Sequence, residues 1–341
     1  MEDCSQTWYR DPGELTVGPA GQEIIGGKRM RLAEQTAILG LSLTMGILPA
    51  GLAVALVEQA RASLIAPQRI HYLKHHPAAK TAAEFQTEPA YRIHEIGRDN
   101  RLVPRVFLAR LPADLADLPP DQRKVVFASA VLPLVLRVNE MLIEDRRRLQ
   151  GIRQRTSAGR RIENWEVRWS LRVARIYRTG QPQSLAQVDW PALLRRLDII
   201  PPSLGIAQAA NESGWGTSRF AREGNAIFGQ WIFGQGPGMI PAQRPQGSAH
   251  RVRQFNFLIE SVLGYAQNLN THEAYQEFRR LRAEGRAAGA IPDGSALAAT
   301  LVNYSVRGEA YVEDIQSIIR LNRLEPLDGA QLITRRGFAA R

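Results

Sequence analysis

The chain has 341 residues and a formal net charge of +11, and its 44% hydrophobic and 23% charged residues exclude wholesale disorder. The positive charge favours anionic surroundings such as nucleic acid, anionic lipid or an acidic cell wall. Scattered arginines on solvated helix faces explain the same charge, and no zinc-finger spacing or aromatic RNA-binding signature accompanies it. We therefore expect no nucleic-acid partner.

Residues 1–35 precede an apolar segment from Thr36 to Val57 that contains no charged side chain. About twenty apolar residues are what a helix needs to cross a bilayer. A buried core helix of a soluble protein and a cleaved signal, with Ala60-Arg-Ala62 as a cleavage site, are the alternatives. Positive residues before the segment place the N-terminus in the cytoplasm. We expect a single-pass inner-membrane protein, anchored through residues 36–57, with everything that follows in the periplasm.

Residues 58–160 are interpreted as a linker and helical lead-in without catalytic features. Leu118-Pro-Pro-Asp121 predicts a helix start. Apolar residues then recur at helical spacing from Lys124 to Ile152, with a kink expected at Pro133. The polar segment from residue 153 to 161 predicts a break. The histidines of this region lack partner ligands at usable spacing, and Cys4 is the chain's single cysteine. No metal, disulfide or cofactor is expected.

A second helix is predicted from Glu163 to Tyr177, with Trp165 and Trp169 four residues apart as core residues. A third begins at Pro201-Pro-Ser203, with the serine as N-cap. Its small residues predict a buried helix that ends at Ser213-Gly-Trp-Gly216, where glycines permit the chain to reverse.

This arrangement places Glu212 at the C-terminal end of a buried helix. Desolvation and the negative end of the helix dipole both disfavour a carboxylate there and raise its pKa. A carboxyl group that stays protonated near neutral pH is what a glycosidase needs to protonate a leaving oxygen. A structural role in a cap or a salt bridge is the alternative.

Four stretches, taken in order, resemble bacterial glucosaminidases of glycoside hydrolase family 73, and in particular their Bax-type branch. They are Gln208-Ala-Ala-Asn-Glu-Ser-Gly-Trp-Gly-Thr-Ser218, Asn225-Ala-Ile-Phe-Gly-Gln-Trp231, a stretch with Phe255, Ser261 and Tyr265, and Asn303-Tyr-Ser305 followed by Gly308-Glu-Ala-Tyr311. The resemblance covers residues 189–323.

The resemblance implies a mainly α fold: a lysozyme-like α domain with a small glycine- and proline-rich β-lobe, Gln230 to Gln254, as one wall of a glycan groove. It implies cleavage of the bond after N-acetylglucosamine in the glycan strands of peptidoglycan. Glu212 would be the general acid, and Tyr304 would position a water. Candidate residues for holding the substrate are Asn211, Trp215, Asn225, Phe228, Trp231 and Tyr311, although the aromatic ones suit a core equally well.

The chain departs from the two-carboxylate pattern because residues 225–256 contain no Asp or Glu. Glu223 is the nearest possible second acid, and Glu260, Glu309 and Glu313 are later alternatives. If none serves, a bound water or the substrate's own acetamido group would complete the reaction. A non-catalytic wall-binding or scaffold protein and a lytic transglycosylase are the competing functions.

The expected organisation is therefore a cytoplasmic segment at 1–35, an anchor at 36–57 and a lead-in at 58–160. A glucosaminidase domain at 161–325 and a C-terminal tail at 326–341 complete the chain.

Overall fold

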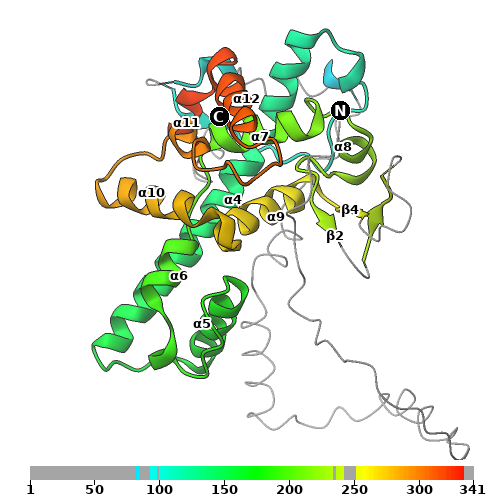
Figure 1. The fold of residues 1–341 in the computed structure, drawn as a ribbon. Helices are drawn as coiled ribbons and strands as arrows, with labels where there is room; N and C mark the ends of the chain where they lie inside the picture. The colour runs from blue at the N-terminus through cyan, green and yellow to red at the C-terminus, as the bar shows by residue number, and fades with distance from the viewer. Residues whose placement is uncertain (1–80, 84–92, 98–99, 233–235, 242–250, 334–341) are drawn as a thin grey trace, which may run out of the picture.

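The computed structural model describes residues 81–83, 93–97, 100–232, 236–241 and 251–333, and these are mostly helical (Figure 1). The apolar segment at residues 36–57 lies outside the described residues, so the anchor stays a prediction. The helices are α4 (Pro120–Ser157), α5 (Asn164–Ile176), α6 (Trp190–Arg196), α7 (Pro202–Ser213), α8 (Arg219–Gly224), α9 (Leu258–Thr271), α10 (Gln276–Ala287), α11 (Gly294–Ala298) and α12 (Glu309–Leu321).

Short strands and 3₁₀ turns connect the helices. The strands are β1 (Leu102–Val103), β2 (Trp231–Ile232), β3 (Gly238–Met239), β4 (Arg251–Arg253) and β5 (Gln331–Leu332), and the 3₁₀ turns include η2 (Leu115–Asp117) and η5 (Glu325–Gly329). Strands β2, β4 and β3 form an antiparallel sheet within the segment predicted to be the β-lobe. Strand β1 pairs in parallel with β5, which ties the two ends of the described chain together.

Helix α4 confirms the helix predicted from Lys124 to Ile152, but it is longer and runs through Pro133 without ending. The break expected from residue 153 therefore begins later, after Ser157. By length and composition α4 is the one described helix that is apolar enough to cross a membrane, yet 83% of its most apolar stretch is buried inside the protein. It has the character of a core helix, and it packs against α7 and α9.

Helix α5 confirms the second predicted helix. Its N-terminus carries a capping box formed by Glu163 and Glu166. Trp169 is fully buried and Trp165 is partly buried against the core, as a packing role predicts. Figure 1 shows α5 and the end of α4 projecting away from the rest of the molecule.

Helix α7 is the centre of the domain, in contact with α4, α11, α12 and η5. It begins at Pro202, so the prediction that Ser203 is the N-cap is wrong. Ser203 instead donates its backbone N–H and its hydroxyl to the carboxyl of Asp328, both at 2.8 Å. Asp328 also accepts from the backbone N–H of Gly294 at 2.8 Å. A carboxyl that is distant in the sequence therefore does what a local cap was expected to do.

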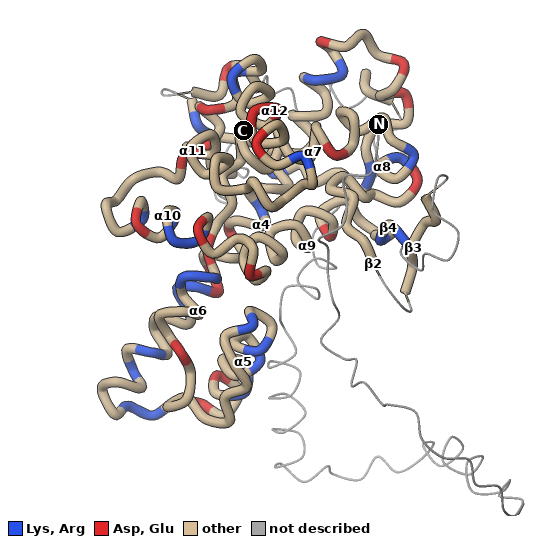
Figure 2. The backbone as a smooth tube through the Cα atoms, in the orientation of Figure 1, with Lys and Arg blue, Asp and Glu red and all other residues tan. Residues whose placement is uncertain are grey.

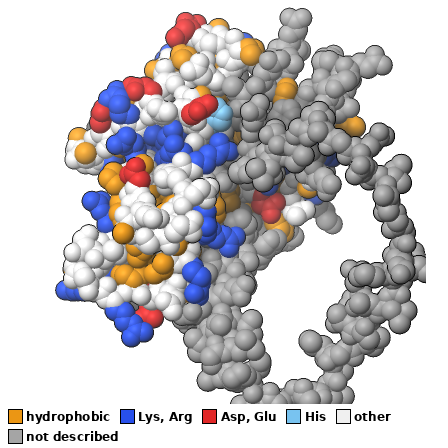
Figure 3. Space-filling model, turned by 60° about the horizontal axis from the view of Figure 1, so that its bottom comes forward, with side chains coloured by type: hydrophobic (Ala, Val, Ile, Leu, Met, Phe, Trp, Pro, Cys, Tyr) orange, Lys and Arg blue, Asp and Glu red, His pale blue; other side chains and the backbone are white. Residues whose placement is uncertain are grey.

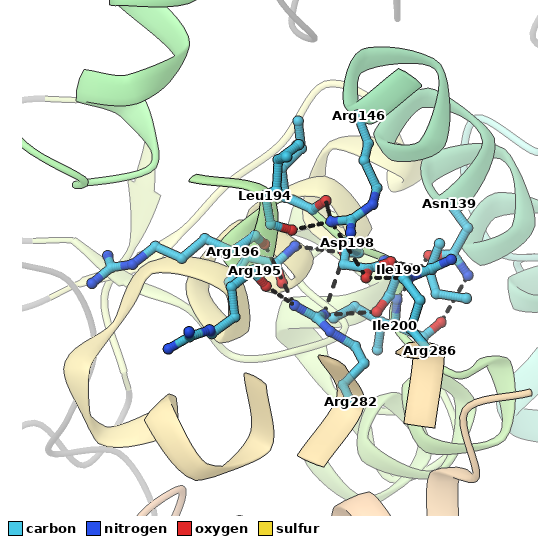
Figure 4. Close-up of polar contacts among 12 residues, drawn as sticks. Asn139, Arg146, Leu194, Arg195, Arg196, Asp198, Ile199, Ile200, Arg282 and Arg286 are labelled. Carbon is cyan, nitrogen blue, oxygen red and sulfur yellow. Dashed lines mark hydrogen bonds and ion pairs between the residues drawn. The ribbon is translucent and has the colours of Figure 1, made fainter. Parts of the chain in front are cut away.

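The loop that leads into α7, residues 197–200, is held by buried polar side chains (Figure 4). Asn139 of α4 donates to the carbonyl of Ile200 at 2.7 Å and accepts from its N–H at 2.9 Å. Arg282 of α10 is 1% exposed and donates to the carbonyls of Ile199 at 2.7 Å and Arg195 at 3.1 Å. These contacts satisfy carbonyls that burial would otherwise leave unpaired.

Asp198 supplies the counter-charge inside this loop. Its buried carboxylate accepts from Arg286 Nε at 2.6 Å and lies 3.6 Å from Arg146. Asn270 of α9 donates to the carbonyl of the same residue at 2.9 Å. Helices α4, α9 and α10 therefore all bind the loop that fixes where α7 starts.

We predict that Arg282→Met lowers the free energy of unfolding by about 3–5 kcal/mol, because it removes one partner from a buried charged network and leaves carbonyls unpaired. Urea denaturation followed by circular dichroism measures the change. Arg280→Met is the matched control on the same helix, because Arg280 is exposed and pairs only with Glu277 and Glu284. Equal losses in the two variants would contradict the role given to Arg282.

Candidate active site

Glu212 lies one residue before the end of α7, and the chain reverses directly after it. Gly214 closes the helix with φ 59°, and Trp215 (φ 58°) and Gly216 (φ 80°) follow in the same left-handed region. Ser213 stabilises the turn, since its hydroxyl donates to the carbonyl of Ala209 at 2.6 Å and accepts from the N–H of Gly216 at 2.8 Å. The predicted helix end is confirmed.

Gly216 is also required by close packing. A Cβ atom at this position would lie 2.7 Å from Leu111, 2.8 Å from Leu115 and 2.9 Å from Phe127. The turn after Glu212 is therefore pressed against the start of α4 and the segment before it, which fixes the carboxyl-bearing end of α7 in the core.

A chain of hydrogen bonds, which we call the relay, connects Tyr265, Gln208 and Tyr311 to Glu212. Tyr265 of α9 donates to Gln208 Oε1 at 2.6 Å. Gln208 Nε2 donates to the Tyr311 hydroxyl at 2.8 Å, and that hydroxyl donates to Glu212 Oε1 at 2.9 Å. Gln208 and Glu212 are four residues apart on α7, so they share one face of the helix. Tyr265, Gln208 and Tyr311 are almost fully buried.

The order of donors in this relay follows from the amide of Gln208. Its oxygen accepts from Tyr265, so its NH₂ group faces Tyr311. The Tyr311 oxygen is then an acceptor from Gln208, and its own proton is directed to Glu212 Oε1. When the Glu212 carboxyl is protonated, its proton consequently belongs on the other oxygen, Oε2.

The pKa of Glu212 is raised from 4.5 to about 7. Desolvation by burial is the largest cause, and it outweighs hydrogen bonds from Tyr311 and Asn211 and the charge of Arg307, all of which favour the carboxylate. Arg307 is itself held by an ion pair with Asp314 at 2.6 Å. The carboxyl is therefore divided between its two protonation states near neutral pH, as the sequence predicted.

Three buried tyrosine rings pack together next to the Glu212 carboxyl. Tyr304 is buried and stacks on Tyr311 with ring centres 5.1 Å apart and planes 9° apart, and Tyr275 lies 6.0 Å from Tyr304. Burial and the nearby Glu212 raise the pKa of Tyr304 and of Tyr311 well above 10.0. Both phenols are therefore neutral at neutral pH.

Asn225 and Phe228, two of the residues predicted to hold the substrate, make contacts inside the protein. Asn225 is fully buried and donates to the carbonyls of Phe255 at 3.0 Å and Asn256 at 3.2 Å, which ties the start of the lobe to its end. Phe228 is buried and stacks on Tyr265 at 3.9 Å. Both residues pack inside the protein, and no surface for a sugar is visible on either.

Three further predicted residues differ in exposure: Trp231 is buried, Trp215 is partly buried and Glu223 is exposed. Trp231 of β2 borders a small hollow of about 30 Å³ between the sheet and α9, together with Arg253 and Gln267. Trp215 is partly buried, with its ring edge-on to Phe127 at 5.8 Å. Glu223 is exposed on α8, with its carboxylate 3.7 Å from Arg219. A role for any of the three in binding or catalysis stays a prediction.

Gln208, Tyr265, Arg307 and Asp314 had no role assigned from the sequence. The structure joins Gln208 and Tyr265 to Glu212 through hydrogen bonds, and the charge of Arg307, which is paired with Asp314, acts on the Glu212 carboxyl. A helical spacing of four was the available signal for Gln208. No local pattern indicates Arg307 or Asp314, because their place depends on how α12 packs on α7.

No group of three or more His, Cys, Asp or Glu side chains is arranged to hold a metal ion within the described part of the chain. A cavity of about 350 Å³ lies apart from Glu212, bordered by Arg101, Asp293, Glu325 and Asp328 among others. None of the predicted site residues borders it.

Residues 190–324, which include α7, the relay and α12, match the family described as mannosyl-glycoprotein endo-beta-N-acetylglucosaminidase. The chain therefore contains a glucosaminidase-family domain, which supports a glycoside-hydrolase-like function on a glycan such as peptidoglycan. It is also 32% identical over 196 residues to Protein bax of Escherichia coli (strain K12), a match that covers 55% of this chain and 66% of that protein. The chain is therefore similar to Bax-type, glucosaminidase-like proteins, and it spans slightly less than two thirds of this relative's length. No solved structure matches it significantly.

We predict a pH-dependent stability difference between the wild type and Glu212→Gln. A pKa raised from 4.5 to about 7 means that the folded state favours the protonated carboxyl, so its contribution is complete below pH 4.5 and is lost as pH rises through 7. From pH 4 to pH 9 the wild type should lose about 3 kcal/mol relative to the variant. Urea unfolding at each pH measures this. Exposed Glu223→Gln is the control, and a difference that stayed flat for Glu212→Gln would refute the assignment.

Proposed function

We propose that this protein is a peptidoglycan hydrolase that cleaves the glycosidic bond after N-acetylglucosamine, with Glu212 as general acid. The observation that carries the proposal is a carboxyl with a pKa of about 7 at the end of a buried helix, inside a glucosaminidase-family domain. Such a group is protonated often enough near neutral pH to give its proton to a leaving oxygen.

The relay supports the same role. Because the Tyr311 hydroxyl donates to Glu212 Oε1, the acidic proton is left on Oε2, the oxygen that would give it to the substrate. A defined proton position is needed because proton transfer in the transition state requires hydrogen-bond geometry between acid and leaving oxygen. Gln208 and Tyr265 act as positioning residues: they touch no substrate, and they hold Tyr311 in its donor orientation.

The group that attacks the sugar is proposed to be a water or the substrate's acetamido oxygen. No carboxylate stands in residues 225–256, and Glu223, the nearest acid, is exposed and paired with Arg219. Tyr304 is the proposed residue for positioning a water, and its phenol remains neutral in this environment. Net inversion of the product would support the water, and net retention would support the acetamido route.

The missing lobe carboxylate also favours two other functions for the same site. A lytic transglycosylase uses one glutamate and releases anhydro-muramyl ends. A non-catalytic wall-binding protein keeps the groove without turnover.

We further propose that residues 36–57 anchor the chain in the inner membrane, with residue 58 onward in the periplasm. Protease protection in intact and permeabilised spheroplasts tests that placement.

Digestion of purified peptidoglycan by the full chain tests the activity. We predict that wild type releases reducing N-acetylglucosamine ends and that Glu212→Gln lowers the rate about 10²–10⁴-fold, the usual contribution of general acid catalysis. Glu223→Gln, a carboxyl-to-amide change on the exposed neighbouring helix, should retain most of the activity. Anhydro ends would identify a transglycosylase instead. Binding without cleavage by wild type would leave the scaffold function.

The relay predicts how substitutions of its residues shift the pH dependence of the cleavage rate. The rate should fall as pH rises through about 7, because the acid must be protonated. Tyr311→Phe removes a hydrogen bond that stabilises the carboxylate, so the pKa of Glu212 rises and the alkaline limb moves to higher pH. Tyr265→Phe frees the Gln208 amide to rotate, and it should move the limb in the same direction by less. Tyr177→Phe, a buried tyrosine outside the relay, serves as control. An unchanged limb in Tyr311→Phe would exclude the relay.

A further inference from the structure

The end of α4 and the whole of α5 form a projecting helical hairpin, residues 143–180, which we call the arginine hairpin (Figure 2). It contains eleven arginines, no lysine and four acidic residues, a net charge of +7 within a chain whose total is +11. Most of the chain's excess positive charge is therefore concentrated in about a ninth of its length, and this part lies away from the helix end that carries Glu212.

The acidic residues of the hairpin are engaged in contacts that fix its shape. Glu166 is buried and binds Arg155 through two hydrogen bonds of 3.0 and 2.6 Å, which joins the two helices. Glu163 lies 3.6 Å from Arg161, and Glu144 lies 3.4 Å from Arg137 of the core-facing part of α4. These acids leave the surface with an uncompensated positive charge.

Several exposed arginines form no ion pair or hydrogen bond through their side chains in the described part of the chain: Arg147, Arg153, Arg160, Arg172 and Arg175. Arg172 and Arg175 are three residues apart on α5 and so lie on one side of that helix. Arg160 follows the end of α4 in the turn between the helices. Their guanidinium groups carry donors in a fixed fork that suits phosphate oxygens.

Half-buried apolar side chains accompany the charge. Ile162, Trp165, Leu171 and Ile176 are only partly covered by the core. The guanidinium of Arg148 lies over the ring of Trp165 at 5.8 Å. Figure 3, turned to bring this side of the molecule forward, shows blue Lys and Arg side chains around an area of orange hydrophobic ones. Arginine beside tryptophan and aliphatic side chains is the composition of helices that lie in a membrane interface.

We propose that the arginine hairpin lies on the surface of an anionic phospholipid bilayer. Its charge complements the lipid phosphates, and its partly exposed apolar side chains gain free energy from the acyl boundary. The phosphate backbone of a nucleic acid would satisfy the arginines but offers nothing to these apolar groups. The predicted anchor at residues 36–57 would keep the hairpin near such a surface, because residues 58–80 span at most about 80 Å. Docking through the hairpin leaves the Glu212 site uncovered.

The test uses the full chain in nanodiscs, so that contact by the hairpin is measured separately from insertion elsewhere. A fluorophore is attached at the hairpin tip through Ala158→Cys in a Cys4→Ser background, and its quenching by doxyl-labelled lipid reports contact. We expect quenching in discs that contain phosphatidylglycerol and little in discs of phosphatidylcholine alone. It should disappear near 0.5 M NaCl, where the Debye length is about 4 Å.

The triple variant Arg160→Gln, Arg172→Gln and Arg175→Gln should weaken docking about 100-fold, since each arginine near an anionic surface contributes about fivefold. The matched control removes the same charge elsewhere, with Arg110→Gln, Arg222→Gln and Arg320→Gln, and it should dock as wild type does. Two results would overturn the proposal. One is equal quenching in both lipids or in both triple variants. The other is hairpin-dependent binding of a DNA duplex more tightly than the phosphatidylglycerol surface. Activity on peptidoglycan should be the same in all variants.

Discussion

The desolvation of one carboxyl group is the constraint on which the rest of the site depends. The pKa of Glu212 is raised to about 7 because α7 is buried along almost its whole length. A helix buried so completely must have the polar groups at both of its ends satisfied by other parts of the chain. The left-handed turn at Gly214 satisfies the C-terminal end, and the carboxyl of Asp328 satisfies the N-terminal end. The loop before the helix is bound by Asn139 and Arg282. The raised pKa of Glu212 therefore results from the buried position of α7.

The hydrogen bonds around Glu212 determine which of its two carboxyl oxygens carries the proton. Burial alone would raise the pKa without deciding which carboxyl oxygen carries the proton. The buried amide of Gln208 has one orientation compatible with Tyr265, and that orientation decides what the Tyr311 hydroxyl donates to. A neutral network of this kind is stabilising only when all its members are paired, so it also makes this part of the core specific.

Prediction from the sequence succeeded where the signal was local. The apolar spacing of α4, the helix containing Trp169 and the glycine-containing turn after Glu212 are each written into a few neighbouring residues, and each is present. The raised pKa of Glu212 followed from the same local pattern. Errors arose where distant residues compete with a local rule. Ser203 has the residue type and position of an N-cap, but Asp328 is 125 residues away and takes that function. Tyr311 contacts Glu212 across 99 residues, and only the family resemblance had named it as a candidate, because no periodicity encodes such a contact. The buried positions of Asn225 and Phe228 depend in the same way on distant contacts, with Phe255 and Tyr265 respectively.

The tie between Asp328 and the start of α7 has a consequence for the order of events during synthesis. A nascent chain emerges from its N-terminal end, so α7 leaves the ribosome long before residue 328 does. Until then the first turn of α7 lacks its acceptor, and strand β1 lacks β5, its partner near the C-terminus. The contacts that hold both ends of this part of the fold are therefore complete only after residues 328–332 have been made. A chain that stopped before residue 328 would carry Glu212 without the packing that raises its pKa, so its carboxyl would be ionised near neutral pH.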